Sequence, residues 1–310
     1  MSAGTILLTR RDGQELLDMD ACIDAVECAF RAHAEGRVLA PGVLGAHVDG
    51  GGFHVKTAGL SSGARGYFAA KVNANFPGNR ERHGLPTIQG VIALFDVGTG
   101  RPLALLDSAE ITSVRTAAAT AVAARYLARS DSAVVAVCGC GVQGRAQLRA
   151  LTRVLPIRTA LAFDADHGRA EEYAATMRRE LGLEVRAVGD VRPGAFVAAV
   201  GADNPEKQEI DPALMASSTV VVDSLDQCAT IGDLHHALAA GLMTAADVRA
   251  ELGEIVAGRK LGRASLDDTI VFDSTGTALQ DVAAAALVYE RAVAEGRGMA
   301  VDLGSSSVLQ

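Results

Sequence analysis

The chain has 310 residues, enough for two domains of ordinary size. Hydrophobic residues make up 49% of it, which allows a large core, and the net charge of −8 argues against nucleic acid as a main partner. No run of about 18 apolar residues predicts a membrane span, and the N-terminus lacks a signal-peptide pattern. The five scattered cysteines are typical of a reduced, cytoplasmic protein and do not have the spacing of a metal site.

The first third of the chain predicts one helix followed by a sheet. A helix is expected over residues 20–36, with Asp20 as its N-cap. Extended segments follow, with turns at Pro41-Gly42 and at residues 50–52 and 61–63. Strands are predicted at residues 67–72, 90–95 and 103–106. Together they indicate a mixed, mainly antiparallel α+β domain.

The rest of the chain alternates strands and helices. Helices are expected over residues 112–128, near 169–181 and over 279–295, and strands at 134–138, 160–163, 184–188, 196–200, 220–223 and 269–272. The pattern predicts an α/β Rossmann-type domain over residues 119–279, with a doubly wound sheet. The first domain comprises residues 1–118 with 280–310, because the last helix is expected to return to it.

The sequence from Val134 to Gly144 is the strongest local signal. A short apolar strand runs into Gly139-Cys140-Gly141-Val142-Gln143-Gly144, a Gly-x-Gly-x-x-Gly turn that opens a helix. Such glycines allow a tight turn, close approach of the backbone to a pyrophosphate, and close packing of helix on strand. The N–H groups and positive dipole end of the helix then favour phosphate.

Asp164 follows the next strand, 20 residues after Gly144, where a carboxylate can accept hydrogen bonds from the ribose hydroxyls of a dinucleotide. This acid favours NAD over NADP, since it would repel a 2′-phosphate and Arg169 is the nearest candidate cation. The alternative is a plain strand-to-helix turn in which Asp164 caps the helix that begins near His167.

One connection is too short. Only residues 189–195 separate the strand at 184–188 from the next one, whereas a parallel crossover needs about a dozen residues or more, usually with a helix. Either this half of the sheet is partly antiparallel, or the chain lacks a segment there.

Several motifs occur in one order along nearly the whole chain, and together they resemble the ornithine cyclodeaminase/mu-crystallin family. They are Lys71 with Asn73–Asn79, Gly84–Gly90, Leu94-Phe95-Asp96 to Asp107, Ile111–Ala118, the glycine turn, Val200–Pro205 and Phe272–Gly276.

The resemblance implies a dimerising substrate domain built from both chain ends and an inserted Rossmann domain. It implies hydride transfer between a nicotinamide cofactor, NAD or NADP, and the α-carbon of a small amino or imino acid. Ketimine reductase or amino-acid dehydrogenase activity is the leading expectation. Ornithine cyclodeamination, which forms proline and ammonia, is the second, and a non-enzymatic dinucleotide-dependent binding role is the third. A homodimer is expected.

The resemblance also implies roles for individual residues. Lys71 would bind the substrate carboxylate or carbonyl, Asp203 would hold the nitrogen and assist proton transfer, and Thr275 would touch substrate. Arg115 would lie near the cofactor phosphates and the substrate. The remaining cofactor contacts would come from Thr87, Gly139, Gly141, Val142, Gln143, Gly144, Asp164, Val200, Gly201, Ala202, Lys207 and Ser274.

Residue chemistry supports these roles, with an alternative for each. Lys71 lies in an apolar strand, where an unpaired ammonium is costly, unless it is a surface lysine that extends to water. Arg115 lies on a small, apolar helix face and either binds a ligand or forms a structural ion pair. Asp203 follows a strand, where open α/β sheets bind ligands, or else serves the turn before Asn204-Pro205. The segment from Asp273 to Thr275 could instead cap a helix.

The chain departs from the family pattern near its start. Members usually carry Pro-x-Arg, whose arginine binds the carboxylate, whereas this chain has Pro41-Gly42-Val43. His54 and Lys56 stand nearby, two residues apart on one face of a predicted strand. We therefore expect Lys56 to replace the arginine in substrate binding and His54 to act as an acid or base.

Overall fold

The computed structural model describes residues 4–62, 65–191 and 195–303. Packing divides the chain into two units, unit 1 (residues 1–115 with 277–310) and unit 2 (residues 116–276). The boundaries expected from the sequence, 118/119 and 279/280, fall inside helix α4 (Ser108–Leu127) and at the start of helix α11 (Ala278–Glu295). No helix in the described ranges is long and apolar enough to cross a membrane.

Unit 1 is built on a seven-stranded sheet with the order β14-β1-β6-β5-β4-β3-β2. Its long strands β2 to β5 are connected in sequence and antiparallel, while β1 runs parallel to β6. The sheet is therefore mixed and mainly antiparallel, as the sequence predicted. The strands are β1 (Thr5–Leu8), β2 (Val38–Val48), β3 (Gly51–Ser62), β4 (Arg65–Asn75), β5 (Ile88–Asp96), β6 (Pro102–Asp107) and β14 (Met299–Val301).

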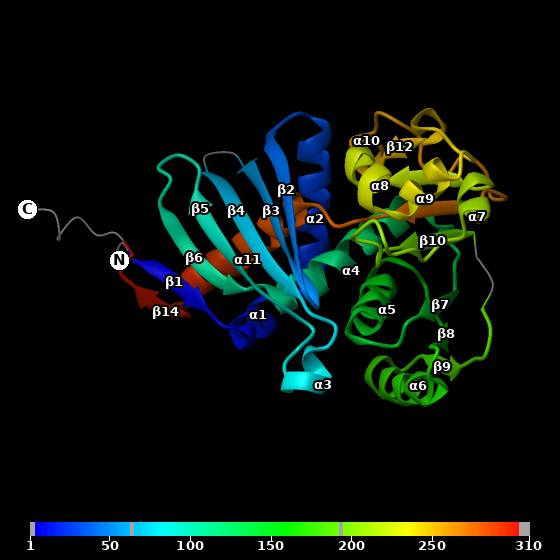
Figure 1. The fold of residues 1–310 in the computed structure, drawn as a ribbon, viewed down its shortest axis with the longest axis horizontal. Helices are drawn as coiled ribbons and strands as arrows, with labels where there is room; N and C mark the ends of the chain where they lie inside the picture. The colour runs from blue at the N-terminus through cyan, green and yellow to red at the C-terminus, as the bar shows by residue number, and fades with distance from the viewer. Residues whose placement is uncertain (1–3, 63–64, 192–194, 304–310) are drawn as a thin grey trace, which may run out of the picture. The chain divides into compact units, whose positions relative to one another are not determined.

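Helix α11 packs on β3, β4 and β5, and α2 (Met19–Ala34) packs against α11 (Figure 1). The apolar face of α2 predicted the helix, and Ile23, Val26 and Phe30 are buried. Its N-cap is Asp18, whose carboxylate accepts the N–H of Ala21, so the expectation of Asp20 was wrong by half a turn. Either aspartate could cap by residue type, and the backbone at Asp18 is the one in the extended conformation that a cap requires.

The Pro41-Gly42 pair is not a turn. Strand β2 continues through it with a shift of register between Leu39 and Gly42. Because β2 is the last strand of the sheet, its proline needs no ladder partner on the open side. The sequence also gave no expectation of β1, β14, α1 (Arg10–Leu16) or α3 (Asn79–His83), elements too short to show periodicity. A capping box at Thr9 and Asp12 was the one local signal for α1.

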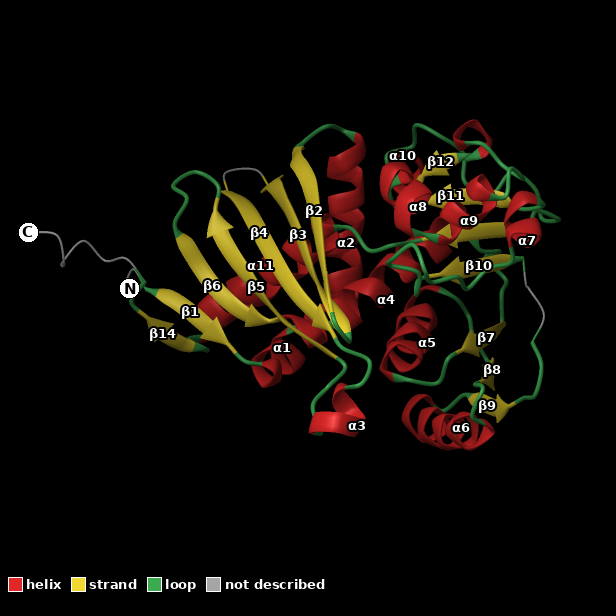
Figure 2. Ribbon diagram, viewed as in Figure 1, coloured by secondary structure: helices red, strands yellow, loops and turns green. Residues whose placement is uncertain are grey.

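Unit 2 holds two all-parallel sheets (Figure 2). The first has the order β7-β8-β9 and the second β10-β13-β11-β12. The strands are β7 (Val134–Cys138), β8 (Thr159–Phe163), β9 (Glu184–Ala187), β10 (Phe196–Ala199), β11 (Thr219–Val222), β12 (Ala250–Glu251) and β13 (Ile270–Asp273). The helices are α5 (Val142–Val154), α6 (His167–Leu181), α7 (Pro212–Ala216), α8 (Leu225–Ile231), α9 (Asp233–Ala239), η1 (Ala245–Asp247) and α10 (Leu252–Val256).

The short connection explains the division into two sheets. Ala187 ends β9 and Phe196 begins β10, which leaves residues 188–195 for the crossover. The idea that this half is partly antiparallel was wrong, since every pairing of described strands in unit 2 is parallel. No ladder among the described residues joins β7 to β10.

The two faces of strand β7 are covered unequally. Val137 belongs to the core that α5 and α6 form with β8, together with Leu148, Tyr173 and Met177. On the other face Val134 is 61% exposed, and Cys138 is exposed as well. A crossover helix ordinarily covers a face of a parallel sheet, so the short connection accounts for the exposure.

We expect two valines of β7 to respond differently to substitution. Val134→Thr should change the free energy of unfolding by less than about 0.5 kcal/mol, because the side chain is already in water. Val137→Ala should cost about 1 to 3 kcal/mol, because it leaves a cavity in the core. Urea unfolding of both variants measures the difference, and similar losses at the two positions would show that both faces of β7 are covered.

Candidate active site

The glycine turn has the geometry that its spacing predicted. Gly139 has a φ of +92°, which favours glycine, and a Cβ at Gly144 would lie 2.2 Å from the carbonyl oxygen of Gly139. The hydroxyl of Tyr173 donates to the carbonyl of Gly144 at 3.0 Å, so α6 also holds the turn. Gly141 is the N-cap of α5 and contributes no side-chain cap, and Val142 beside it is 76% exposed. The start of this 13-residue helix is thus open to an anion.

Asp164 lies beside the turn at the end of β8. Its carboxylate accepts the N–H of Cys140 at 2.8 Å and that of Asp166 at 3.0 Å, and these bonds lower its pKa. Helix α6 is capped by Asp166, which accepts the N–H groups of Gly168 and Arg169. The alternative in which Asp164 caps the helix was therefore wrong. Arg169, the nearest candidate for a 2′-phosphate, contacts Asp166 at 3.6 Å.

The segment after β10 folds back on itself. Glu209 accepts the N–H of Gly201 at 2.9 Å, and Lys207 forms an ion pair with Asp203 at 2.6 Å. Both side chains of that pair are 42% exposed, so the ion pair adds little to the stability of the fold. Asp203 therefore stays accessible to solvent. The turn role belongs instead to Asn204, whose side-chain oxygen accepts the N–H of Glu206. Val200 and Ala202 lie in the same segment.

A buried aspartate that the sequence analysis missed holds the loop after β13. Asp223, at the end of β11, accepts the hydroxyl of Ser274 at 2.8 Å and the N–H groups of Thr275 and Gly276 at 3.3 and 2.8 Å. The helix-cap alternative for this loop was wrong, because the N-cap of α11 is Thr277. The signal was present: like Asp164, Asp223 directly follows a buried strand.

Asp273 is fully buried at the end of β13 and accepts the N–H of Leu234 at 2.9 Å. Burial raises its pKa to about 7, and the charges of Asp223 and Asp233 add to the effect. This carboxyl group anchors α9 to the strand.

The buried charges of unit 1 gather around one carboxylate. Asp281, in the first turn of α11, is bound through Oδ2 to Lys71 Nζ at 2.6 Å and through Oδ1 to Arg115 Nε at 2.8 Å. Arg115 Nη1 also donates to the side-chain oxygen of Gln280 at 2.8 Å. The charge of Lys56 lowers the pKa of both Lys71 and Asp281. Lys56, Lys71, Arg115 and Asp281, here called the charge cluster, are at most 7% exposed.

Strand register explains why two lysines meet there. Each strand from β2 to β5 contributes one residue to a row of cross-strand partners, and the side chains in such a row project to one face of the sheet. In chain order the row is Val43, Lys56, Lys71 and Ile92. His54 is opposite Asn73 on that same face, two residues from Lys56, as the sequence predicted. Like charges directly opposite each other are destabilising, and burial adds to the cost. Such an arrangement is typical of a functional site.

The electrostatics of the cluster favour an anion. Burial lowers the pKa of Lys71 to about 7, with Arg115 and Lys56 acting in the same direction and Asp281 against it. For Asp281, burial raises the pKa but the attraction of Arg115 and Lys71 outweighs it, and the net change is a lowering. A carboxylate entering beside these cations would gain charge-assisted hydrogen bonds.

The expectations for this cluster are partly met. The alternative of Lys71 as a surface lysine was wrong, since its side chain is 4% exposed. Arg115 forms the structural ion pair that was its alternative reading, and its contact with cofactor phosphates stays a prediction. Thr87 is half-buried before β5, and its carbonyl accepts the N–H of Phe76. Asp281 and Gln280 were missed, although a carboxylate in an alanine-rich helix is as unusual as Arg115 was.

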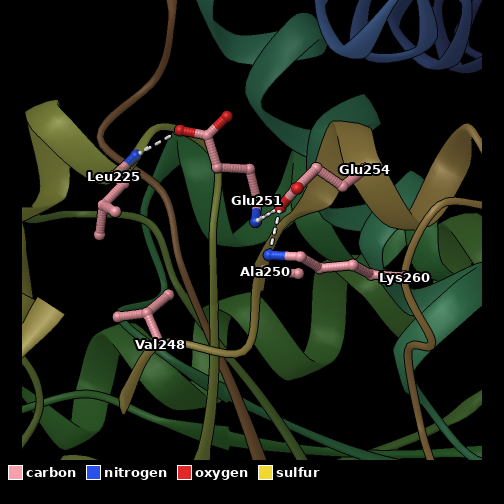
Figure 3. Close-up of a pocket in the computed structure, with 6 residues that line it drawn as sticks. All are labelled: Leu225, Val248, Ala250, Glu251, Glu254 and Lys260. Carbon is pink, nitrogen blue, oxygen red and sulfur yellow. Dashed lines mark hydrogen bonds and ion pairs between the residues drawn. The ribbon is translucent and has the colours of Figure 1, made fainter. Parts of the chain in front are cut away.

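A cavity of about 280 Å³ opens elsewhere in unit 2 (Figure 3). The two carboxylates that line it already have partners within the fold. Glu251 accepts the N–H of Leu225 at 2.8 Å. Glu254 accepts the N–H of Glu251 at 3.0 Å and forms an ion pair with Lys260 at 3.0 Å. It contains none of the predicted site residues. The lining is Leu225, Val248, Ala250, Glu251, Glu254 and Lys260.

Comparison with known proteins decides the family. The model of the ornithine cyclodeaminase/mu-crystallin family matches residues 4–192 and 189–296. This chain belongs to the ornithine cyclodeaminase/mu-crystallin family. The expected resemblance and the α/β fold class are thereby confirmed.

Individual relatives align with this chain over nearly their whole length. An alanine dehydrogenase of Archaeoglobus fulgidus is 35% identical over 95% of this chain and 97% of its own. The structure of an archaeal alanine dehydrogenase dimer with bound NAD has a TM-score of 0.91 at 33% identity, covering 97% of this chain and 99% of that one. The Δ1-pyrroline-2-carboxylate reductase of Thermococcus litoralis, in complex with NADH and L-proline, has a TM-score of 0.90 at 32% identity, covering 96% and 100%.

The comparisons also support the second explanation of the short crossover. The family match breaks into two parts that meet at residues 189–192, where the crossover begins. Ninety-five per cent of the 310 residues is about 295, so about 22 of the 317 positions aligned with the Archaeoglobus fulgidus enzyme have no counterpart in this chain. Together these positions amount to about the length of a helix with its loops.

Proposed function

We propose that this protein is an NAD(P)-dependent oxidoreductase that acts on the C–N bond of a small amino or imino acid, as an imine reductase or amino-acid dehydrogenase. The observation that carries the proposal is the charge cluster of Lys56, Lys71, Arg115 and Asp281 on the covered face of the unit 1 sheet. Family membership and the alanine dehydrogenase and pyrroline-2-carboxylate reductase relatives support it.

The dinucleotide would bind to unit 2. The positive φ of Gly139 and the close approach at Gly144 fit a turn that receives a pyrophosphate. Asp164, with its pKa lowered, is an ionised acceptor for ribose hydroxyls and favours NAD over NADP. The remaining contacts proposed are Gly141, Val142, Gln143, Val200, Gly201, Ala202, Lys207 and Ser274 from unit 2, and Thr87 and Arg115 from unit 1.

The substrate carboxylate would bind to Lys71 and Lys56 with Arg115 beside them, and Thr275 would contact the substrate. When bound, NADH would supply a hydride to the carbon of the protonated imine, which gives the amine and NAD⁺. Asp203 would stabilise the iminium nitrogen, since a protonated imine is the better hydride acceptor. His54 would serve as an acid or base beside Lys56.

Lys56 can take the place of the family arginine because of where it lies. Val43, which occupies the arginine's position, is the direct cross-strand partner of Lys56, and the Cβ atoms of such partners are about 5 Å apart. A cation at either position therefore reaches the same region beside Lys71.

Exchanging these two positions tests the proposal. Lys56→Met should raise the KM for the carboxylate substrate about 10- to 100-fold, because a charge-assisted hydrogen bond is lost. Val43→Arg combined with Lys56→Met should recover much of that loss by restoring the family arrangement. Steady-state kinetics measures both, and an unchanged KM in Lys56→Met would rule out its role.

The activity itself is tested by following nicotinamide absorbance with NADH and NADPH. The substrates are pyruvate with ammonia or methylamine, cyclic imino acids, and ornithine. We expect net consumption of NADH with an imino acid or with pyruvate and an amine. Proline formed from ornithine without net cofactor consumption would instead show a cyclodeaminase.

We also propose a cytoplasmic homodimer that forms through the outer face of the unit 1 sheet. Leu44, Val55, Val72 and Val91 form one cross-strand row on that face, opposite the face that α11 covers, and Leu44 and Val91 are 66% and 52% exposed. A second copy would bury this apolar row, and the similar archaeal alanine dehydrogenase structure is a dimer. All five cysteines are free, which suits a reducing compartment. Sedimentation of the purified protein should give a dimer, and a monomer would contradict the proposal.

A further inference from the structure

Asp281 has no role in the hydride-transfer scheme, yet it forms ion pairs with two cations of the charge cluster. Its two oxygens divide between two cations, Oδ2 to Lys71 at 2.6 Å and Oδ1 to Arg115 at 2.8 Å. The three side chains come from three different elements, β4, α4 and α11. One carboxylate thus fixes the spacing of two cations that would otherwise repel each other.

We propose that Asp281 is a positioning residue, which holds Lys71 and Arg115 side by side to receive the substrate carboxylate and favours the protonated form of the Lys71 amine. The inference rests on the proposed function for its catalytic meaning, but not for the behaviour of Lys71 in the free protein.

The position of Asp281 on its helix suits this role. It lies in the first turn of α11, where the helix dipole favours a negative charge, and its exposure is 1%. It does not cap the helix, since the N-cap is Thr277. The neighbouring Gln280 also binds Arg115, but through a neutral oxygen. Of the two residues that the structure shows bound to Arg115, only Asp281 provides ionic attraction.

The charges around Lys71 have opposing effects that can be separated. Lys56 on β3 and Arg115 on α4 disfavour its protonation, as burial does, and Asp281 on α11 favours it. Its cross-strand partner on β5 is the apolar Ile92, which contributes no charge. Lys71 therefore stands near its midpoint at neutral pH, with a pKa of about 7, and loss of the Asp281 charge would leave it neutral.

The consequence for catalysis is a defined pH dependence. A Lys71 that has lost its proton no longer attracts a carboxylate, so the KM should rise as the pH rises through the pKa of Lys71. Removing the Asp281 charge moves that rise to lower pH, and lowering the pH should restore binding. A residue that only supported the fold would not give recovery at low pH.

The test follows Lys71 directly by NMR of the free protein labelled at the lysine ¹³Cε positions. In Asp281→Asn the titration of Lys71 should move down by about one pH unit or more, and in Arg115→Met it should move up, because a repelling charge is gone. Gln280→Met, which removes a neutral partner of Arg115, is the matched control and should leave the titration nearly in place. Asp281→Glu keeps the charge and should stay close to the original protein.

An unchanged Lys71 titration in Asp281→Asn, or shifts of the same sign in Asp281→Asn and Arg115→Met, would overturn the inference. If Asp281→Asn does not fold, Asp281→Glu and Arg115→Met still decide, since only an electrostatic role predicts a small change in one and a rise in the other. The measurement needs no substrate, so it stands even if the enzyme assay fails. Where activity is found, the pH of the KM rise should move with the NMR titration.

Discussion

The attraction of three buried cations to one carboxylate is the constraint around which unit 1 is arranged. Lys56, Lys71 and Arg115 lie on β3, β4 and α4, and Asp281 on α11 draws the last two together. The register of β2 to β5 places the lysines opposite each other, and α11 covers them. A cluster with this charge balance is costly for a fold that uses it only for stability, because buried charges need close to full compensation. A substrate carboxylate would supply what Asp281 alone does not.

Unit 2 depends on a different arrangement, in which acidic side chains at the ends of parallel strands bind backbone N–H groups. Asp164 fixes the glycine turn, Asp223 fixes the loop after β13, and Asp273 anchors α9. These carboxylates shape the carboxyl edge of the sheets, where open α/β folds bind dinucleotides. The short crossover leaves this unit as two sheets, with one face of β7 open to solvent.

Much of this was predictable from local chemistry. The glycine spacing predicted the turn, the apolar pattern predicted α2 and the strands β4 and β5, and an isolated lysine in an apolar strand pointed to a buried site. The predictions that failed concern features that are determined by contacts with distant parts of the chain. The partner of Arg115 is 166 positions away in the sequence, so no local pattern could identify Asp281. The choice of Asp18 over Asp20 as a cap, and of a bulge over a turn at Gly42, depended on how the backbone meets its neighbours.

The central claim is that the charge cluster is a binding site for a carboxylate, with Lys71 only partly protonated beforehand. Binding an anion there should therefore draw protons from the solution. Titration calorimetry with pyruvate and NAD⁺ at about pH 8, in buffers of different ionisation enthalpy, measures that uptake. The account predicts net proton uptake that is lost in Lys71→Met. Binding of pyruvate with no proton uptake, or with the same uptake in Lys71→Met, would contradict it.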